Sequence, residues 1–330
     1  MLQKKFFNRY LYLVVFAVVF AAIACNGRNL ETSFKDKSSE GNNVVESCRA
    51  AESSESYHEG NGDSDGITSI EKGPVFDRSF RFVVMGDTRP ASIDGSQPVV
   101  FKQILEKVRD FSPQYIFIVG DIIYGGTSDI TSLDSQFDGF TAAAGDLLPK
   151  VIVAPGNHDT PNINAQKMFE DRIGKLYWSF DFLSVHFILL DSEVVGQQGS
   201  ISGGQLDWLR SDLDASDGCD LCFVFLHRPL YSFMHTEDDG TGQPFSSKEN
   251  RDELAELFTS HGIEAVFSGH EHLFNYNYRD GVKYFITGCA GAFPYVSEEK
   301  GGFFHYLVVE ISKEEVNYRL FRLDEGEINF

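Results

Sequence analysis

Residues 80–89 read FRFVVMGDTR, and this stretch decides how the rest of the chain is interpreted. The run Phe80–Met85 is short and rich in Phe and Val, which predicts a buried strand. The run stops at Gly86, and Asp87 and Arg89 follow directly. In open α/β sheets, ligands gather beyond the carboxyl ends of the strands. The stretch therefore predicts a strand and, just after it, the first residues of a site.

The same arrangement occurs four more times along the chain. Apolar runs over 115–119, 150–154, 222–226 and 265–267 each lead directly into a polar tail. The tails read GDIIY (120–124), PGNHD (155–159), HRP (227–229) and SGHEH (268–272). We expect the five strand ends to converge on one rim and their polar side chains to share one site.

The remaining patterns predict an α/β fold of two packed β-sheets flanked by helices. Helical spacing of apolar residues occurs over 99–111, 206–213 and 254–258, and a further strand is expected over 186–190. After residue 275 we expect an antiparallel run over 275–278, 283–287, 304–311 and 316–323. Asp280-Gly281 is a favourable hairpin turn within that run.

Composition narrows the classes of protein that fit. Of 330 residues, 42% are apolar and 23% are charged, which fits neither wholesale disorder nor a multi-span membrane protein. The formal charge is −21, and a nucleic-acid partner is disfavoured because such proteins carry a basic face. Five Cys are too few for a scaffold built on disulfides.

The first 24 residues are predicted to be a signal peptide. A basic start is followed by 15 uncharged residues over Tyr10–Ala24, which is short for a transmembrane span. The exit, AIAC at 22–25, resembles a bacterial lipoprotein signal, in which Cys25 receives the lipid. This implies a bacterial cell-envelope protein that is lipid-anchored to a membrane, with plain secretion or an uncleaved anchor as alternatives.

Residues 25–75 are expected to form a low-complexity tether. The segment is polar, and its apolar residues are scattered without a period, so it cannot bury enough surface to offset its ordering entropy. Residues 76–330 remain for a single catalytic domain.

The candidate ligands in the polar tails are two Asp, one Asn, three His and one Tyr, with no Cys among them. Oxygen and imidazole ligands suit Mn, Fe, Zn or Ni rather than an iron–sulfur cluster. His270 and His272 are two residues apart, so both face one side of an extended segment. A carboxylate such as Asp121 can bridge two cations, and a bridged pair suits displacement at phosphorus.

The five tails, in this order, resemble the calcineurin-like metallophosphoesterase superfamily over about residues 80–295. The resemblance implies a two-sheet α/β-β/α sandwich and a dinuclear metal centre with a bridging hydroxide. It assigns the first metal to Asp87, Asp121 and His272, and the second to Asn157, His227 and His270, with Asp121 as the bridge. His158 would donate a proton to the leaving oxygen or bind the phosphate.

One position departs from the superfamily pattern. Most members have a His ligand where this chain has Arg89. Purple acid phosphatases also lack that His and use a Tyr three residues after the bridging Asp, where Tyr124 stands here. Either Tyr124 completes the first metal, or water does. Arg89 is expected to clamp the substrate phosphate through its planar fork.

Other polar residues have structural interpretations. Arg228 is expected to form a surface salt bridge, with substrate contact as the alternative. Asp191 is expected to be structural. His186, His235, His261 and His305 match no motif and are expected to be structural or solvated. Cys219 and Cys222 form a CxxC that is weak evidence for zinc. Two free or otherwise paired thiols are expected, with a strained disulfide as the alternative.

The predicted function is hydrolysis of phosphomonoesters, with a phosphorylated small molecule or macromolecule as substrate. A phosphodiesterase of nucleotides or lipid headgroups is the alternative within enzymes. A surface binding lipoprotein with a structural metal site is the alternative of another class. We expect the ester preference to depend on the loops around 161–175 and 235–247.

Overall fold

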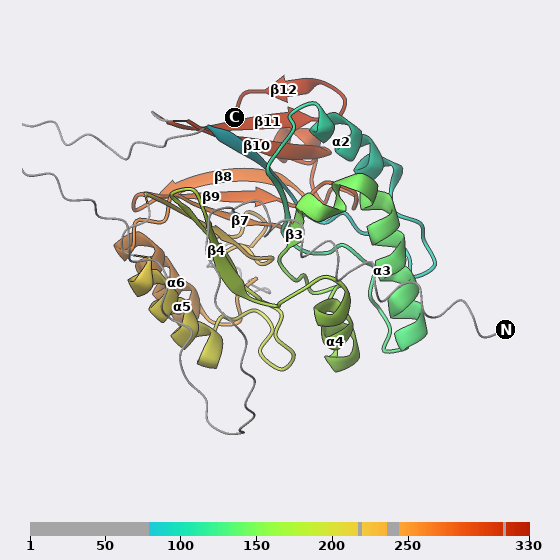
Figure 1. Ribbon diagram of the computed structural model, residues 1–330, viewed down its shortest axis with the longest axis horizontal. Helices are drawn as coiled ribbons and strands as arrows, with labels where there is room; N and C mark the ends of the chain where they lie inside the picture. The colour runs from blue at the N-terminus through green and yellow to red at the C-terminus, as the bar shows by residue number, and fades with distance from the viewer. Residues whose placement is uncertain (1–78, 217–219, 236–243, 313–314) are drawn as a thin grey trace, which may run out of the picture. The chain divides into compact units, whose positions relative to one another are not determined.

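The computed structural model describes residues 79–216, 220–235, 244–312 and 315–330 (Figure 1). The predictions for the signal peptide, for Cys25 and for the tether lie outside the described residues. Within the described ranges, no helix is both long and apolar enough to cross a membrane.

Two six-stranded sheets form the centre of the fold, as predicted. The first sheet has the order β12-β11-β10-β1-β2-β3, with β1, β2 and β3 parallel. Its strands are β1 (Phe80–Met85), β2 (Tyr115–Ile118), β3 (Val151–Val153), β10 (His305–Ile311), β11 (Val316–Arg322) and β12 (Gly326–Ile328).

The second sheet has the order β4-β5-β6-β7-β9-β8, with β5, β6, β7 and β9 parallel. Its strands are β4 (Trp178–Phe182), β5 (Val185–Leu189), β6 (Leu221–Phe225), β7 (Ala265–Ser268), β8 (Phe274–Arg279) and β9 (Val282–Thr287). Both sheets thus contain a parallel core, and the polar tails follow strands of these two cores.

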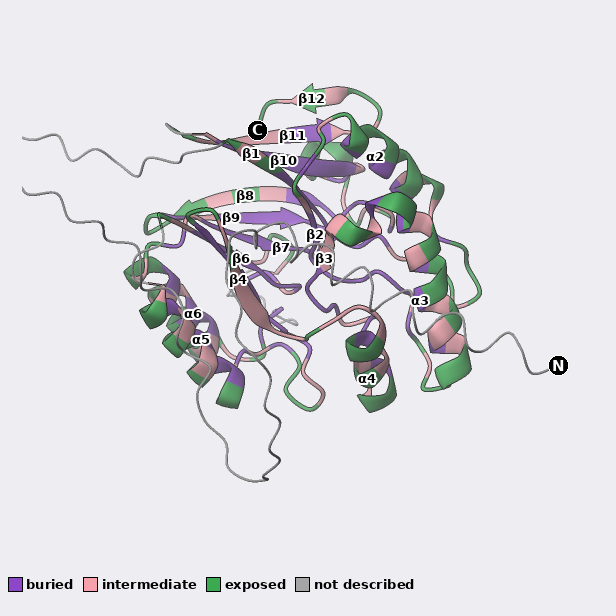
Figure 2. Cartoon of the chain, viewed as in Figure 1, coloured by how far each residue is buried: buried purple, intermediate pink, exposed green. Residues whose placement is uncertain are grey.

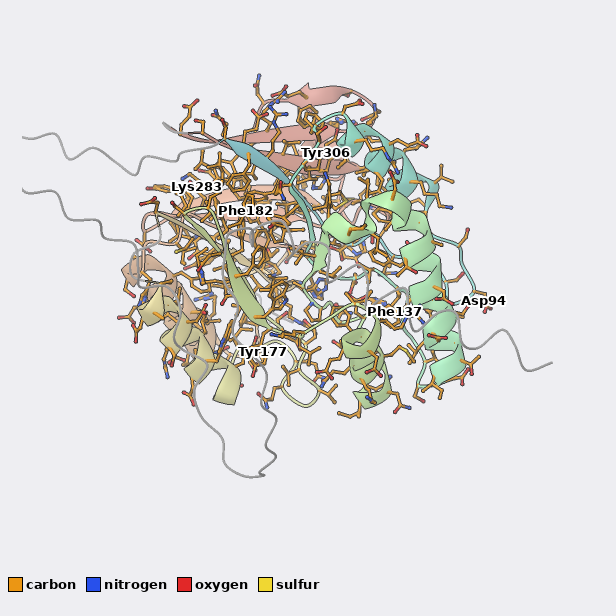
Figure 3. The ribbon with its side chains drawn as sticks, in the orientation of Figure 1. Asp94, Phe137, Tyr177, Phe182, Lys283 and Tyr306 are labelled. Atoms are coloured by element: carbon orange, nitrogen blue, oxygen red, sulfur yellow. The ribbon has the colours of Figure 1, made fainter. Side chains whose placement is uncertain are left out.

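The sheets pack face to face because alternate side chains of each strand are apolar. In β1, Phe82 and Val84 point toward the second sheet, whereas Val83 and Met85 point toward the outer helices. The rings of Phe117 and Phe225 stack across the interface with centroids 4.0 Å apart. Side chains fill the space between the layers, as Figure 3 shows.

Helices cover the outer faces of both sheets (Figure 1), so that buried residues lie in the centre (Figure 2). Helices α2 (Val99–Arg109), α3 (Ile130–Ala144) and α4 (Ile163–Arg172) pack on the first sheet. Helices α5 (Gly203–Ala215) and α6 (Lys248–Ser260) pack on the second. Two short 3-10 turns, η1 (Gly145–Lys150) and η2 (Glu298–Lys300), complete the described elements.

The structure corrects the predicted C-terminal arrangement. The predicted antiparallel run is divided: β8 and β9 join the second sheet, where β9 is parallel to β7, while β10 and β11 join the first. The predicted hairpin at Asp280-Gly281 is confirmed, with φ of 49° and 89°. The segment 161–175, expected to be a loop, contains α4.

Candidate metal centre

The predicted site residues all follow parallel strands at one rim of the sandwich. The first sheet supplies Asp87 after β1, Asp121 after β2 and Asn157 with His158 after β3. The second sheet supplies His227 after β6 and both His270 and His272 after β7. The site therefore lies where the carboxyl ends of two sheets meet, and the contacts below link residues from both.

Three of these residues have a left-handed backbone conformation. Asp87, Asp121 and His270 have φ of 55°, 57° and 68°, and none of them is Gly. Such a conformation costs about 1–3 kcal/mol for a residue with a side chain and concentrates at functional sites. Each of the three follows a Gly at the end of a strand, where the chain turns sharply.

Two glycines allow these carboxylates to lie close to neighbouring backbone. A Cβ built on Gly156 would overlap Asp121 Oδ1, and one built on Gly269 would overlap Asp87 Oδ2. The motif glycines are therefore needed for the close packing of the site, as the sequence suggested.

One part of the site, which we call the His227 half, consists of Asn157, His227 and His270 beside the shared Asp121. Asn157 Oδ1 lies 2.9 Å from both His227 Nε2 and His270 Nδ1, and these two nitrogens are 3.2 Å apart. His227 Nε2 is also 3.5 Å from Asp121 Oδ1. His227 is completely buried, so these donors converge in a space closed to solvent on that side.

The other part, the His272 half, consists of Asp87 and His272 beside the same Asp121. His272 Nε2 lies 3.2 Å from Asp87 Oδ1, and Asp87 Oδ2 accepts a hydrogen bond from the His270 amide at 3.0 Å. Asp87 Oδ1 is buried and has no hydrogen-bond partner among the described residues.

The tautomers of two histidines fit a metal site. His227 Nδ1 donates to Val119 O and His272 Nδ1 donates to Phe293 O, each at 2.8 Å. A carbonyl oxygen can only accept, so in the neutral form of either ring the lone pair is on Nε2, the atom that faces the carboxylates. Ligating histidines commonly donate their other N–H in this way. When an imidazole lone pair faces a carboxylate oxygen with no proton between them, the two repel each other, and a cation bound between them would remove that repulsion.

The charges at the site favour the metal-binding forms of Asp121 and His270. Burial would raise the pKa of Asp121, but His227, His158 and Arg89 together hold it below its usual range. Burial, with the positive charges of His227 and Arg228, lowers the pKa of His270 to about 2, so that this ring stays neutral. A carboxylate and a neutral imidazole are the forms that bind metal. Burial would lower the pKa of His227, but the charges of Asp121, Asp87 and Glu193 raise it above its ordinary value, so a metal ion would displace a proton there.

Asp87, Asp121 and His227 each offer a ligand atom within 4.8 Å of the others. The donor set fits a metal site, and the residues predicted for two metals lie together. Tyr124 contacts the site differently: its carbonyl oxygen accepts from His158 Nδ1 at 2.6 Å, and its ring lies 5.8 Å from that of His158. None of these contacts tests its predicted role as a ligand.

The two candidate catalytic side chains, Arg89 and His158, approach the same oxygen. Arg89 Nε lies 3.4 Å and His158 Nε2 lies 3.9 Å from Asp121 Oδ2. Because His158 Nδ1 donates to the Tyr124 carbonyl, Nε2 is the atom that faces the site. The side chains of His158 and Arg89 are 28% and 14% exposed, so both are accessible from solvent.

Sequence reasoning missed the role of Asp159, although its motif was recognised. Its buried carboxylate accepts four backbone N–H groups: Asp121, Ile122, Ile123 and Gly156. It thereby fixes the turn that carries Asp121 against the turn that carries Asn157. Burial and the nearby Asp121 raise its pKa to about 7, while the amide donors favour the carboxylate.

Glu193 and Glu271 position the second sheet's part of the rim. The completely buried Glu193 binds Arg228 through both carboxylate oxygens, at 2.6 and 3.0 Å. The expected salt bridge of Arg228 is therefore present, but it is partly buried rather than on the surface. Glu271 accepts from the Phe233 and Met234 amides and thus fixes the loop after His227.

His186, His261, His305 and Asp191 have structural contacts, as expected. His186 lies between Asp181 and Asp212, and His261 pairs with Asp214. His305 is buried and its Nδ1 donates to Phe303 O, while Asp191 accepts from the Glu193 amide. Cys222 is buried in β6, and Cys219 lies outside the described residues.

A sequence profile of calcineurin-like phosphoesterases matches residues 80–274, which contain every residue placed in the site above. The chain belongs to this family. The predicted resemblance is thereby confirmed, and phosphoric esters are the class of substrate on which an enzyme of this family acts.

Individual relatives agree with this assignment. The chain is 28% identical over 306 residues to serine/threonine-protein phosphatase CPPED1 of Mus musculus, covering 84% of this chain and 94% of that one. Its fold is similar to purple acid phosphatase PPD1 from yellow lupin, with a TM-score of 0.60, 18% identity and coverage of 76% and 53%. It is also similar to a dimetal phosphatase from Danio rerio, with a TM-score of 0.54, 16% identity and coverage of 77% and 96%.

Proposed function

We propose that this protein hydrolyses phosphomonoesters at a centre of two metal ions. The observation that carries the proposal is the pair of halves that share Asp121, each with an imidazole whose second nitrogen is fixed by a backbone carbonyl. Asp87, Asp121 and His272 would hold one ion, with Tyr124 or water completing it. Asp121, Asn157, His227 and His270 would hold the other.

The bound ions would supply Lewis-acid polarisation of the phosphoryl oxygens and a water of lowered pKa. The residues of the chain would then orient and protonate the ester. Arg89 offers a planar fork to the phosphate oxygens from its place beside Asp121. In its cationic form His158 carries its exchangeable proton on Nε2, which can be donated to the leaving oxygen.

We also propose that the protein is tethered to the bacterial cell envelope through a lipid on Cys25, with residues 25–75 as the spacer. Stable anchoring requires more than a single acyl chain, and a lipoprotein modification would supply several. A Cys25→Ser variant should be released from membranes, whereas the wild type should resist extraction with high salt. Wild-type protein that is removed by salt alone would contradict the anchor.

The decisive experiment is a panel of phosphoesters assayed with metal-stripped protein reloaded with Mn, Fe, Zn or Ni. We expect two metals per chain and turnover of nitrophenyl phosphate well above that of its bis-ester. Faster turnover of the bis-ester would favour the phosphodiesterase alternative. Two bound metals without turnover of any ester would favour the surface binding protein.

A further inference from the structure

A hollow of about 480 Å³ adjoins the His272 half and shares two residues with the candidate site. Arg89 and His272 line the hollow as well as the site, while the rest of its wall is largely apolar. Val99, Phe293 and Tyr295 line it and are among the most exposed large apolar side chains of the described residues, at 68%, 73% and 52%.

This wall is attached to the site by backbone hydrogen bonds. Ala292 N donates to Asp87 O at 2.8 Å, and Tyr295 N donates to His272 O at 3.0 Å. The Phe293 carbonyl is the acceptor that fixes the His272 ring. The segment that carries Phe293 and Tyr295 is therefore held at a fixed place relative to the candidate metal ligands.

Tyr295 lies beside His272 and Arg89, the two residues that line both the hollow and the site. Its ring stacks on the His272 ring with centroids 3.9 Å apart and an interplanar angle of 18°. Arg89 lies near its hydroxyl: burial and Asp87 raise the pKa of Tyr295, and the charge of Arg89 opposes that rise. The edge of the hollow nearest the site is thus built from an imidazole, a guanidinium and a phenol.

The direction of the leaving group follows from the positions of Arg89 and His158. Both reach the same oxygen of Asp121, within 3.4 and 3.9 Å. A leaving oxygen protonated by His158 would then lie on the Arg89 side of Asp121, and Arg89 also lines the hollow. The group attached to that oxygen would enter the hollow and cover the exposed apolar side chains.

We propose that this hollow binds the leaving group of the substrate, and that this group is aromatic or similarly apolar. The inference rests on the proposed phosphomonoesterase function and names its substrate class. Covering an exposed apolar wall is favourable in proportion to the area removed from water. An aromatic ring would also meet Phe293 and Tyr295 in the offset or edge-on contacts that such rings prefer.

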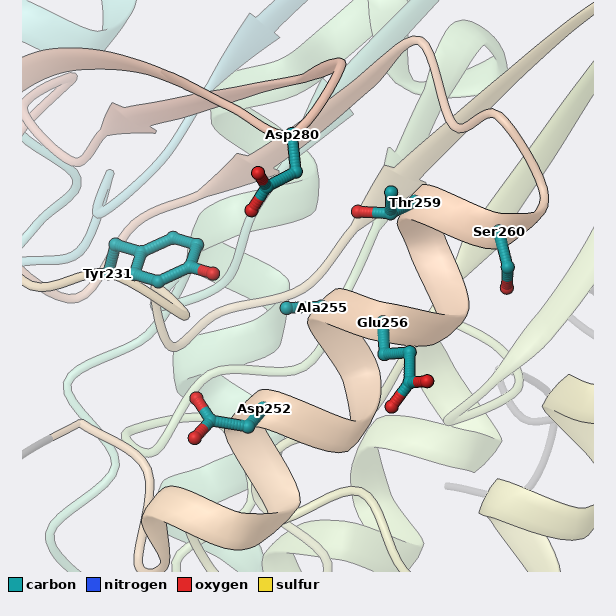
Figure 4. A pocket seen from close by; sticks show the side chains of 7 residues that line it. All are labelled: Tyr231, Asp252, Ala255, Glu256, Thr259, Ser260 and Asp280. Carbon is teal, nitrogen blue, oxygen red and sulfur yellow. The ribbon is translucent and has the colours of Figure 1, made fainter.

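A second hollow does not suit the same ligand. It has a volume of about 430 Å³ and lies between α6 and the turn of the β8–β9 hairpin (Figure 4). Asp252, Glu256 and Asp280 line it, and these three carboxylates would repel a phosphate ester. The hollow beside Arg89 combines apolar surface with a cation, as an apolar phosphate ester requires.

The test compares 2-naphthyl phosphate with glycerol phosphate in Phe293→Ser and Val99→Ser. Tyr278→Ser is the control for Phe293, since Tyr278 is an aromatic residue 62% exposed outside the hollow. Ile163→Ser is the control for Val99, because each is the first residue of a helix and both are more than 60% exposed. Melting temperatures of all four variants should match that of the wild type.

We expect wild-type kcat/KM to favour the naphthyl ester. That preference should fall about tenfold in Phe293→Ser, or about 1.4 kcal/mol, less in Val99→Ser, and not at all in either control. Dissociation constants of naphthylmethylphosphonate and methylphosphonate should change in the same ratio, without any turnover. Hydrolysis of both esters with an unchanged ratio in all variants would overturn the inference and leave the proposed function intact.

The phosphomonoesterase proposal can also fail while the proposal for the hollow holds. Naphthylmethylphosphonate that binds more tightly than methylphosphonate, with the difference lost in Phe293→Ser, would support the hollow even if no ester were hydrolysed. In that case the phosphomonoesterase proposal would fall alone. A wild type that prefers a phosphoserine peptide or glycerol phosphate to the naphthyl ester would contradict the apolar leaving group directly.

Discussion

The two halves of the site share Asp121 but differ in what surrounds them. In the His227 half, three side chains lie within 3.2 Å of one another around the completely buried His227. In the His272 half, Asp87 and His272 meet beside Arg89, and a hollow opens next to them.

This difference suggests a division of work. His227 is completely buried, and the Glu193–Arg228 pair holds the residue that follows it in the chain. The geometry of the His227 half is therefore constrained. The His272 half has three assigned ligands, Asp87, Asp121 and His272. Arg89 lies beside this half and can contact a substrate. A pre-organised metal site needs the first property, and a site that must admit and release a substrate needs the second.

The largest effect is expected from Asp121→Asn, because one residue serves both halves. Loss of the shared negative charge should lower turnover by at least about 100-fold, since even residues that only orient ligands typically cost 10–100-fold. Metal content, measured by elemental analysis, should fall as well. Asp171→Asn on α4 is the control, because Asp171 is an exposed partner of Lys167. A variant with wild-type turnover and full metal content would show that Asp121 is not shared.

Separate substitutions should distinguish the halves. His227→Ala and His272→Ala should each reduce the metal content by one ion per chain, measured after dialysis. His227→Ala should also lower the free energy of unfolding by about 1–3 kcal/mol, because it leaves the buried Val119 carbonyl without its donor. Equal unfolding curves for His227→Ala and the wild type would contradict the closed character of the His227 half.

Tyr124 and Arg89 test how the His272 half is completed. If Tyr124 is a ligand, Tyr124→Phe should lower metal affinity and turnover together, and an iron-loaded enzyme should lose its visible phenolate colour. Arg89→Lys keeps the charge but loses the fork, so it should raise KM about tenfold and leave metal content unchanged. A colourless iron enzyme whose Tyr124→Phe form keeps full metal content would assign that position to water.

Much of this site could be predicted from sequence because its residues follow strands directly. Five strands, each ending in a Gly or polar residue, fixed the positions of Asp87, Asn157 and His270 within one rim. The contacts of Asp159 and Glu271 could not be predicted in the same way. Both accept hydrogen bonds from backbone amides of other loops. Every residue except Pro has such an amide, so the sequence does not show which ones are bound.

The fold was predictable where the apolar pattern was strong and local. Helix α3 was missed even though Leu133, Phe137 and Phe140 have helical spacing and Asp129 caps its first turn. The division of the C-terminal strands between two sheets was missed for another reason. Strand pairing between β1 and β10 joins residues more than 200 positions apart, and no local pattern encodes it. The hollow beside Arg89 depends on the same long-range pairing.

The smallest effect is expected at His186, a histidine that lies outside both halves and serves as a reference for them. Its ring bonds Asp181 Oδ1 at 2.6 Å and Asp212 Oδ2 at 3.0 Å, so both nitrogens face carboxylates. Burial would lower the pKa of His186, but the hydrogen bonds and charges of Asp212 and Asp181 raise it above its ordinary value.

The sign of the pH dependence follows from that raised pKa. The protonated ring stabilises the folded state fully below pH 6.5, and this contribution is lost as the pH rises through the higher pKa of the folded state. His186→Gln should therefore cost more stability at pH 6 than at pH 9, measured by urea unfolding, and Asp181 should contribute little of the difference because it is largely exposed and its charge is screened. Turnover and metal content at pH 7 should match the wild type, because no site residue contacts this ring. A cost that does not vary with pH would show that His186 contributes through packing alone, and a loss of metal would extend the site beyond its two halves.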